Sequence, residues 1–115
     1  MKAVQDALHN IGIPVFALAW KATESAPTTP DRYIVYTTMT VEDEHWDDEL
    51  RQYRVYVYLN FWSKPDPTAD TLSIRSAMRA GGFQLVEETD FFEEDTGYYR
   101  ISSTWVILVE GENVS

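Results

Sequence analysis

An acidic run in the first half of the chain is its densest group of chemically active side chains. Six carboxylates fall within eight residues, with His45 and Trp46 between them: Glu42, Asp43, Glu44, Asp47, Asp48 and Glu49. Carboxylate oxygens suit calcium or magnesium, but the run lacks the turn glycine of the calcium loop D-x-[DN]-x-[DN]-G-x5-E. We therefore expect no metal there. Like charges repel one another, so the run predicts a solvated hairpin loop that can also present negative charge to a partner or a pore.

Trp46 is the unusual residue of this run, because a large apolar ring stands among carboxylates. It either anchors a contact with another protein or packs back on the sheet, and the sequence leaves both open. A second acidic group, Glu93, Glu94 and Asp95, precedes Thr96 and Gly97 in a predicted hairpin loop.

Catalytic groups are sparse. The two histidines, His9 and His45, lie in different predicted elements, and the chain has no H-E-x-x-H, G-x-S-x-G, G-x-G-x-x-G or phosphate-binding glycine loop. It has no cysteine, which excludes disulfides, thiolate catalysis and zinc-thiolate sites. We therefore expect neither enzyme activity nor a cofactor.

The size and charge of the chain limit its partners. Its 115 residues, 44% hydrophobic and 24% charged, suit one folded domain spanning residues 1–115. The 19 acidic and 9 basic residues give a net charge of −10, which disfavours binding to nucleic acid or anionic membranes. The excess of acidic residues either keeps the protein soluble or has a specific functional role, and the sequence leaves both open. No apolar run approaches the roughly 20 residues of a membrane span, and the N-terminus lacks the pattern of a secretory signal, so we expect a soluble protein.

Hydrophobic periodicity and turn residues predict the order α-β-β-β-α-β-β. This is an α+β fold, with a small, mostly antiparallel sheet flanked by two helices. Asp66 and Pro67 suit the start of the second helix, and Gly81 and Gly82 its end. The first helix is predicted within residues 1–10 and the strands at 15–20, 32–39, 50–62, 83–92 and 98–109.

The strand at 50–62 has two different faces. One is apolar and predicts a core: Tyr53, Val55, Val57, Leu59 and Phe61. The other mixes aromatic and polar groups: Arg54, Tyr56, Tyr58, Asn60 and Trp62. Tyrosine and tryptophan favour interfaces, so we predict protein contacts at Tyr56, Tyr58, Trp62 and Trp46. The alternative is a second small core under long loops. Tyr99 and Trp105 likewise share a face of the last predicted strand.

Several segments, taken in order, resemble the small tail-terminator and tail-completion (tail-to-head joining) proteins of long-tailed bacteriophages. They are Gly12-Ile13-Pro14-Val15-Phe16, Tyr33-Ile34-Val35-Tyr36, Asn60-Phe61-Trp62-Ser63-Lys64, Ala80-Gly81-Gly82-Phe83 and Phe91-Phe92-Glu93-Glu94-Asp95-Thr96-Gly97-Tyr98-Tyr99-Arg100. The resemblance covers nearly the whole chain. It implies an α+β fold and a ring, commonly hexameric, at the head-proximal end of the tail. That ring caps the tail tube and joins it to the head connector. The family has no catalytic residues to transfer.

The resemblance also implies partners and a location. The partners are further copies of the chain, the tail tube protein and the head-tail connector protein. The location is the tail-head junction of a virion assembled in the host cytoplasm. Genome DNA would pass through the ring without specific binding, and either acidic loop can line the lumen. A competing class is an acidic module that mimics DNA and inhibits a nucleic-acid-binding protein. It requires carboxylates spaced like phosphates along one face, whereas these acids cluster in two loops.

Overall fold

The computed structural model describes residues 2–17, 30–42 and 52–110. Two helices and five strands follow in the predicted order α-β-β-β-α-β-β, which confirms the α+β fold. They are α1 (Lys2–Leu8), β1 (Val15–Ala17), β2 (Arg32–Glu42), β3 (Gln52–Ser63), α2 (Thr68–Ala80), β4 (Gln84–Glu93) and β5 (Tyr98–Glu110).

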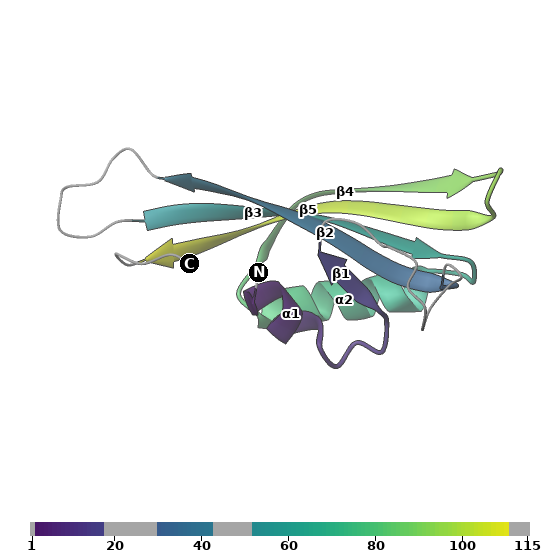
Figure 1. Cartoon of the computed structure of the whole chain (residues 1–115), viewed down its shortest axis with the longest axis horizontal. Helices are drawn as coiled ribbons and strands as arrows, with labels where there is room; N and C mark the ends of the chain where they lie inside the picture. Colours follow the sequence, from purple (N-terminus) through teal and green to yellow (C-terminus); the bar gives the residue numbers. More distant parts are fainter. Residues whose placement is uncertain (1, 18–29, 43–51, 111–115) are drawn as a thin grey trace.

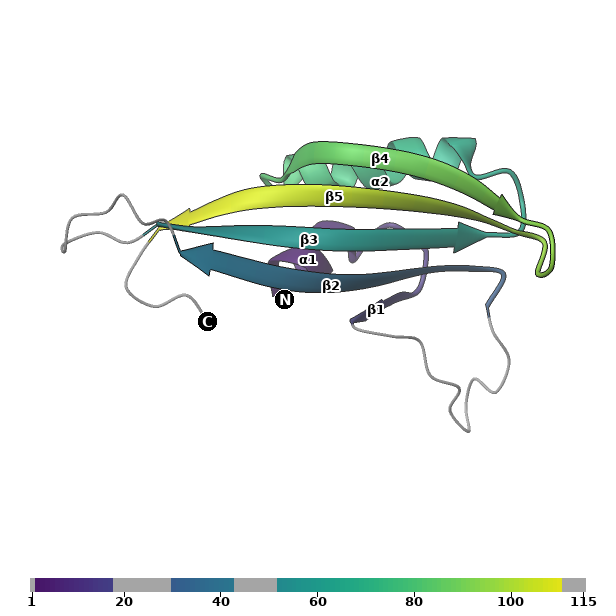
Figure 2. The same ribbon diagram turned by 90° about the horizontal axis from the view of Figure 1, so that it is seen from above.

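The five strands form one sheet in the order β1-β2-β3-β5-β4. β1 runs parallel to β2, and every other pair is antiparallel, so the sheet is mixed but mostly antiparallel, as predicted. Figure 1 shows α1 and α2 side by side on one face of the sheet, and Figure 2 shows the same arrangement from above. The fold therefore has two layers, with the core between the helices and this face.

Alternation along β3 explains the core. Val57, Leu59 and Phe61 are almost fully buried, and Val55 is also buried, because alternate side chains of a strand point to the same face. Trp105 of β5 lies opposite Val57 in the ladder and is fully buried with it. Tyr99 shares the helix-facing side of β5 with Trp105, so neither belongs to the opposite face. The predicted register of β3 is confirmed.

The ends of α2 follow the predicted signals closely. Asp66 accepts hydrogen bonds from the backbone nitrogen and hydroxyl of Thr68, at 3.0 and 2.7 Å, and the helix begins at Thr68, directly after Pro67. At the other end, Gly82 adopts a φ of +92°, in the region that favours glycine. The backbone nitrogen of Phe83 donates to the carbonyl oxygen of Met78 at 3.1 Å, which closes the helix and leads the chain into β4.

Candidate assembly surface

The sheet face away from the helices, here called the open face, is covered by no described helix or strand (Figures 1 and 2). Strand pairing places its side chains in cross-strand rows, because directly opposed residues point to the same side. The rows, from one end of the sheet to the other, are Val41, Arg54 and Leu108; Met39, Tyr56, Val106 and Gln84; Thr37, Tyr58, Thr104 and Glu87; Val35, Asn60, Ser102 and Thr89; and Tyr33, Trp62, Arg100 and Phe91.

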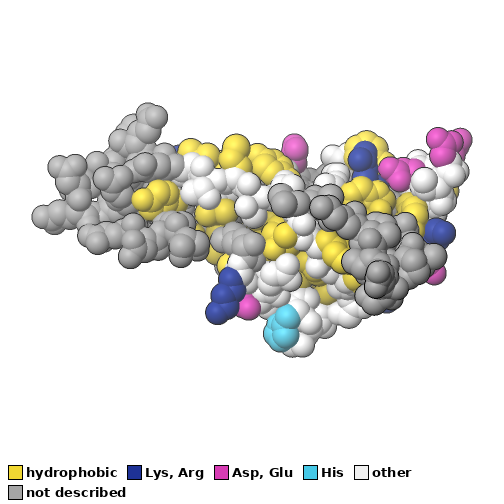
Figure 3. Space-filling model, viewed as in Figure 1, with side chains coloured by type: hydrophobic (Ala, Val, Ile, Leu, Met, Phe, Trp, Pro, Cys, Tyr) yellow, Lys and Arg dark blue, Asp and Glu magenta, His cyan; other side chains and the backbone are white. Residues whose placement is uncertain are grey.

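One end of the open face is apolar. Met39, Val41 and Leu108 expose 47%, 38% and 53% of their surface. Figure 3 shows hydrophobic side chains along the upper edge of the molecule, on the side away from the helices, and others nearer its middle. Arg54 is exposed among them, and no described residue forms an ion pair or hydrogen bond with it. An apolar patch with one unpaired cation is typical of a surface that binds another protein.

The middle of the open face is polar and hollowed. Tyr58 exposes 39% of its surface, and the Ser102 hydroxyl donates to the side-chain oxygen of Asn60. Beside them is a shallow hollow of about 330 Å³. Arg100 lines this hollow and lies over the Phe91 ring, 4.6 Å from its centroid. Its Nε atom is buried without a hydrogen-bond partner among the described residues.

Aromatic rings pack together at the far end of the open face. Tyr33 stacks on Trp62 with centroids 5.0 Å apart and planes 11° apart, and Tyr98 meets Tyr33 edge-on at 5.9 Å. The Tyr98 hydroxyl donates to the carbonyl oxygen of Pro30 at 2.7 Å, while the Lys64 ammonium lies 5.2 Å from the Tyr98 ring. Trp62 thus packs within the chain itself, and its role in an interface stays a prediction.

Burial in this cluster affects the two tyrosine hydroxyls. It raises the pKa of Tyr33, and the neighbouring Tyr98 and Glu93 raise it further. Burial also raises the pKa of Tyr98, with a smaller contribution from Asp31. Both phenols therefore stay neutral to higher pH than a free tyrosine, and they act as packing and hydrogen-bonding groups.

The predicted acidic loops divide between described and undescribed residues. Glu42 is the last residue of β2, whereas residues 43–49, including Trp46, lie outside the described residues. The strands on either side of the run, β2 and β3, pair antiparallel out to Glu42 and Tyr53, and the predicted solvated loop between them stays a prediction. At the other hairpin, Glu93 is half-buried and accepts a hydrogen bond from the Thr96 hydroxyl at 3.2 Å. Glu94 and Asp95 are exposed at the tip.

The acidic residues Glu93, Glu94 and Asp95 of the hairpin arm, residues 92–99, were predicted to face a lumen or a partner, whereas its two exposed rings were not among the predicted interface residues. Figure 1 shows β4 and β5 extending past the end of α2. Phe92 and Tyr99 contact each other there, with ring centroids 4.9 Å apart, and expose 54% and 38% of their surface. Alternation alone assigns both rings to the helix-facing side. The three-dimensional structure is needed to see that α2 ends before it reaches these two rings.

Two ion pairs hold α2 on the sheet. Arg32 of β2 donates to Asp70 at 2.9 Å, and the Arg75 guanidinium donates through two nitrogens to Glu88 of β4, which raises the pKa of Arg75. Both acids are thereby occupied within the chain. These contacts position α2 on the sheet.

Other kinds of site are not evident in the described part of the chain. Its His, Cys, Asp and Glu residues form no group of three or more that could hold a metal ion. His9 is exposed near the end of α1, with Nδ1 2.9 Å from the carbonyl oxygen of Asp6, and His45 lies outside the described residues. Within the same ranges, no helix is long and apolar enough to cross a membrane.

Comparison with known proteins gives a structural likeness. Neither a protein-family model nor a curated protein matches the chain. A chain in the solved virion of a native gene transfer agent (GTA) particle has a similar structure, with a TM-score of 0.65. The two are 12% identical, and the match covers 96% of this chain and 93% of that chain. At this identity the likeness establishes a shared fold over nearly the full length of both.

Proposed function

We propose that this chain is a structural protein of a phage-like virion. The observation that carries the proposal is the fold shared with a GTA virion chain over nearly the whole of both chains. The sequence resemblance, which rests on several segments taken in order, is also to proteins of such particles, namely tail-terminator and tail-completion proteins. The proposed form is a ring, with six copies as the expected number, at the head-proximal end of the tail. There it caps the tail tube and joins it to the head connector.

The surface of the chain supports an assembly role. A sheet with helices on one side normally needs a second cover for large apolar groups, because exposed apolar area is unfavourable in water. Here Met39, Tyr58 and Leu108 stay exposed on the open face. Neighbouring copies, the tail tube protein and the connector protein are the proposed covers.

The charge of the chain supports a conduit for DNA. Six copies carry a formal charge of −60, six times −10. A negative lumen wall lets a phosphate backbone pass without binding, since protein–DNA affinity comes largely from cations that neutralise phosphates. The DNA-mimic alternative gains no support from the described acids. Glu87 and Glu88 of β4 point to opposite faces, and Glu88 is paired with Arg75.

Electron microscopy of the purified protein tests the proposal. The protein alone, and mixed with a tail tube protein and a connector protein, should give closed rings of one size with a central opening. Added tube protein should be found capped by these rings at one end. Single particles that never exceed monomer size under all of these conditions would overturn the proposal.

A further inference from the structure

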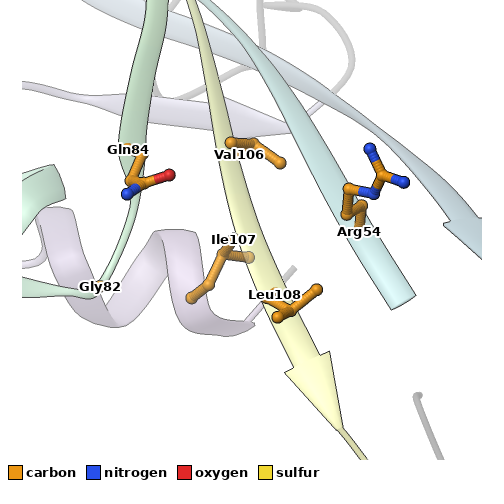
Figure 4. A pocket seen from close by; sticks show the side chains of 6 residues that line it. All are labelled: Arg54, Gly82, Gln84, Val106, Ile107 and Leu108. Carbon is orange, nitrogen blue, oxygen red and sulfur yellow. The ribbon is translucent and has the colours of Figure 1, made fainter. Parts of the chain in front are cut away.

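We propose that the hairpin arm of one copy docks in a groove at the opposite end of the sheet of the next copy. The groove has a volume of about 420 Å³ and is lined by Arg54, Gly82, Gln84, Val106, Ile107 and Leu108. Figure 4 shows Arg54 of β3 and Gln84 of β4 on either side of the β5 residues Val106 and Leu108. This contact rests on the proposed ring, because it is the contact that would close it.

The groove exists because two paired strands end at different places. The β4–β5 ladder begins at Gln84 opposite Val106, while β5 continues to Glu110. Residues of β5 beyond Val106 therefore have no described strand beside them on the β4 side. Leu108 is 53% exposed there, so the groove has an apolar base over which no described residue packs.

The arm and the groove are complementary in chemistry. The arm carries two exposed rings, Phe92 and Tyr99, and an acidic tip at Glu94 and Asp95. The groove carries apolar side chains and the guanidinium of Arg54, which pairs with no residue that the structure describes. In a chain with a net charge of −10, copies repel one another, and this repulsion is reduced where a cation of one copy meets acids of the other. A second copy is thus a matched occupant of the groove.

The positions of the two surfaces fit a ring. Gln84 begins β4 and Glu93 ends it, so nine residue-to-residue steps of about 3.3 Å, roughly 30 Å in all, separate the groove from the tip. One chain cannot fill its own groove across that distance. Two different patches at opposite ends of a molecule make a head-to-tail contact, which gives a closed ring when the rotation between copies closes and an open filament when it does not. The proposed ring is the first case. A self-complementary patch would instead stop at a dimer.

Disulfide trapping tests the contact directly, because the chain has no cysteine of its own. The variant Gln84→Cys with Glu94→Cys keeps Arg54, Asp95 and both arm rings. Mild oxidation of the assembled variant should give a ladder of covalent oligomers ending at the ring size. Each single variant should give nothing larger than a dimer. Leu72→Cys with Glu94→Cys is the matched control, because Leu72 is 54% exposed on α2, away from the groove, and it should give no ladder.

Paired substitutions separate the two surfaces. Phe92→Ser on the arm and Leu108→Ser in the groove should each weaken assembly at least about tenfold, since each removes a large apolar side chain from the contact. Leu72→Ser, with nearly the same exposure, should not. Mixed together, the two defective variants retain one working arm and one working groove between them. They should therefore form dimers and no rings. Circular dichroism melts check that each variant is folded.

The outcomes distinguish this contact from the ring itself. A parent protein that forms no ring alone or with its partners overturns the proposed function, and the contact falls with it. A parent that forms rings, while Phe92→Ser and Leu108→Ser assemble equally well and the cysteine pair gives only dimers, overturns the contact alone. A charge swap tests the pairing of Arg54 with the acidic tip. If Glu94→Lys with Asp95→Lys restores assembly to the Arg54→Glu variant, the pairing is supported. If assembly is not restored, the pairing is contradicted.

Discussion

At the residue scale, neighbours along β3 experience different surroundings. Val57 is fully buried beside Trp105, whereas the next residue, Tyr58, is 39% exposed on the open face. Alternation of side chains produces this contrast within a single strand. Stability and assembly therefore depend on different residues of the same element, and substitutions can separate them.

Val57→Ala should lower the free energy of unfolding by about 1–3 kcal/mol, from lost apolar burial and the cavity left behind. Val41→Ala is the matched control, because it removes the same atoms from a side chain that is 38% exposed, and it should cost less than about 1 kcal/mol. Urea denaturation monitored by tryptophan fluorescence measures both. Equal losses in the two variants would rule out this register for the core.

Asp66 makes a contribution to folding stability that depends on pH. Its hydrogen bonds with Thr68 lower the pKa of the Asp66 carboxyl below its usual value. Because the pKa of Asp66 is lower in the folded state, the ionised carboxylate stabilises the fold above pH ~4. This stabilisation is lost as the pH falls through the pKa of the folded state. Asp66→Ala should therefore lower the melting temperature at pH 7 and match the parent near pH 2. A difference between the two that persists unchanged in acid would contradict this assignment.

At the element scale, α1 approaches the end of α2 closely at a glycine. A Cβ added to Gly81 would lie 2.9 Å from the Cβ of Ala7, closer than real Cβ contacts allow. This approach lets α1 pack over the C-terminal end of α2, where Leu8 and Met78 are both buried. The short helix α1 therefore depends on tertiary packing for its stability, since a helix of seven residues is marginal by itself.

Gly81→Ala should lower the free energy of unfolding by about 1–3 kcal/mol and speed hydrogen exchange in α1, because the added methyl group separates the helices. In an Ala7→Gly background the same substitution should cost less, since the opposing methyl group is gone. A double-mutant cycle measures this coupling. Independent, additive effects of the two substitutions would show that the close approach does not matter.

The elements were largely predictable from sequence, whereas the assembly surface was predictable only in part. Alternation in β3 gave the core face, and Pro67 with Gly82 placed the ends of α2 nearly correctly. The strand at 32–39 extends to Glu42, because pairing with β3 continues beyond the run of β-formers. The sequence could not show that Trp62 stacks on Tyr33, or that Phe92 and Tyr99 lie beyond the helices. Both depend on distances between elements that local patterns do not encode.

At the scale of the whole molecule, two opposing effects act on association. Exposed apolar and aromatic groups on the open face and the hairpin arm favour contact between copies. The net charge of −10 opposes it, most strongly at low ionic strength. Salt screens the repulsion and leaves the apolar contribution largely intact. The balance should therefore shift from monomers to rings as salt is added or as a tail partner binds.

Light scattering after size-exclusion chromatography tests this central claim most directly, at low and high salt, with and without tail tube protein. The parent should shift from small species to a single closed oligomer, with six copies expected. Tyr58→Glu places a further charge in the middle of the open face, and it should remain a folded monomer, with an unchanged circular dichroism spectrum. A parent that stays strictly monomeric under every condition and never binds tube or connector protein would contradict the account.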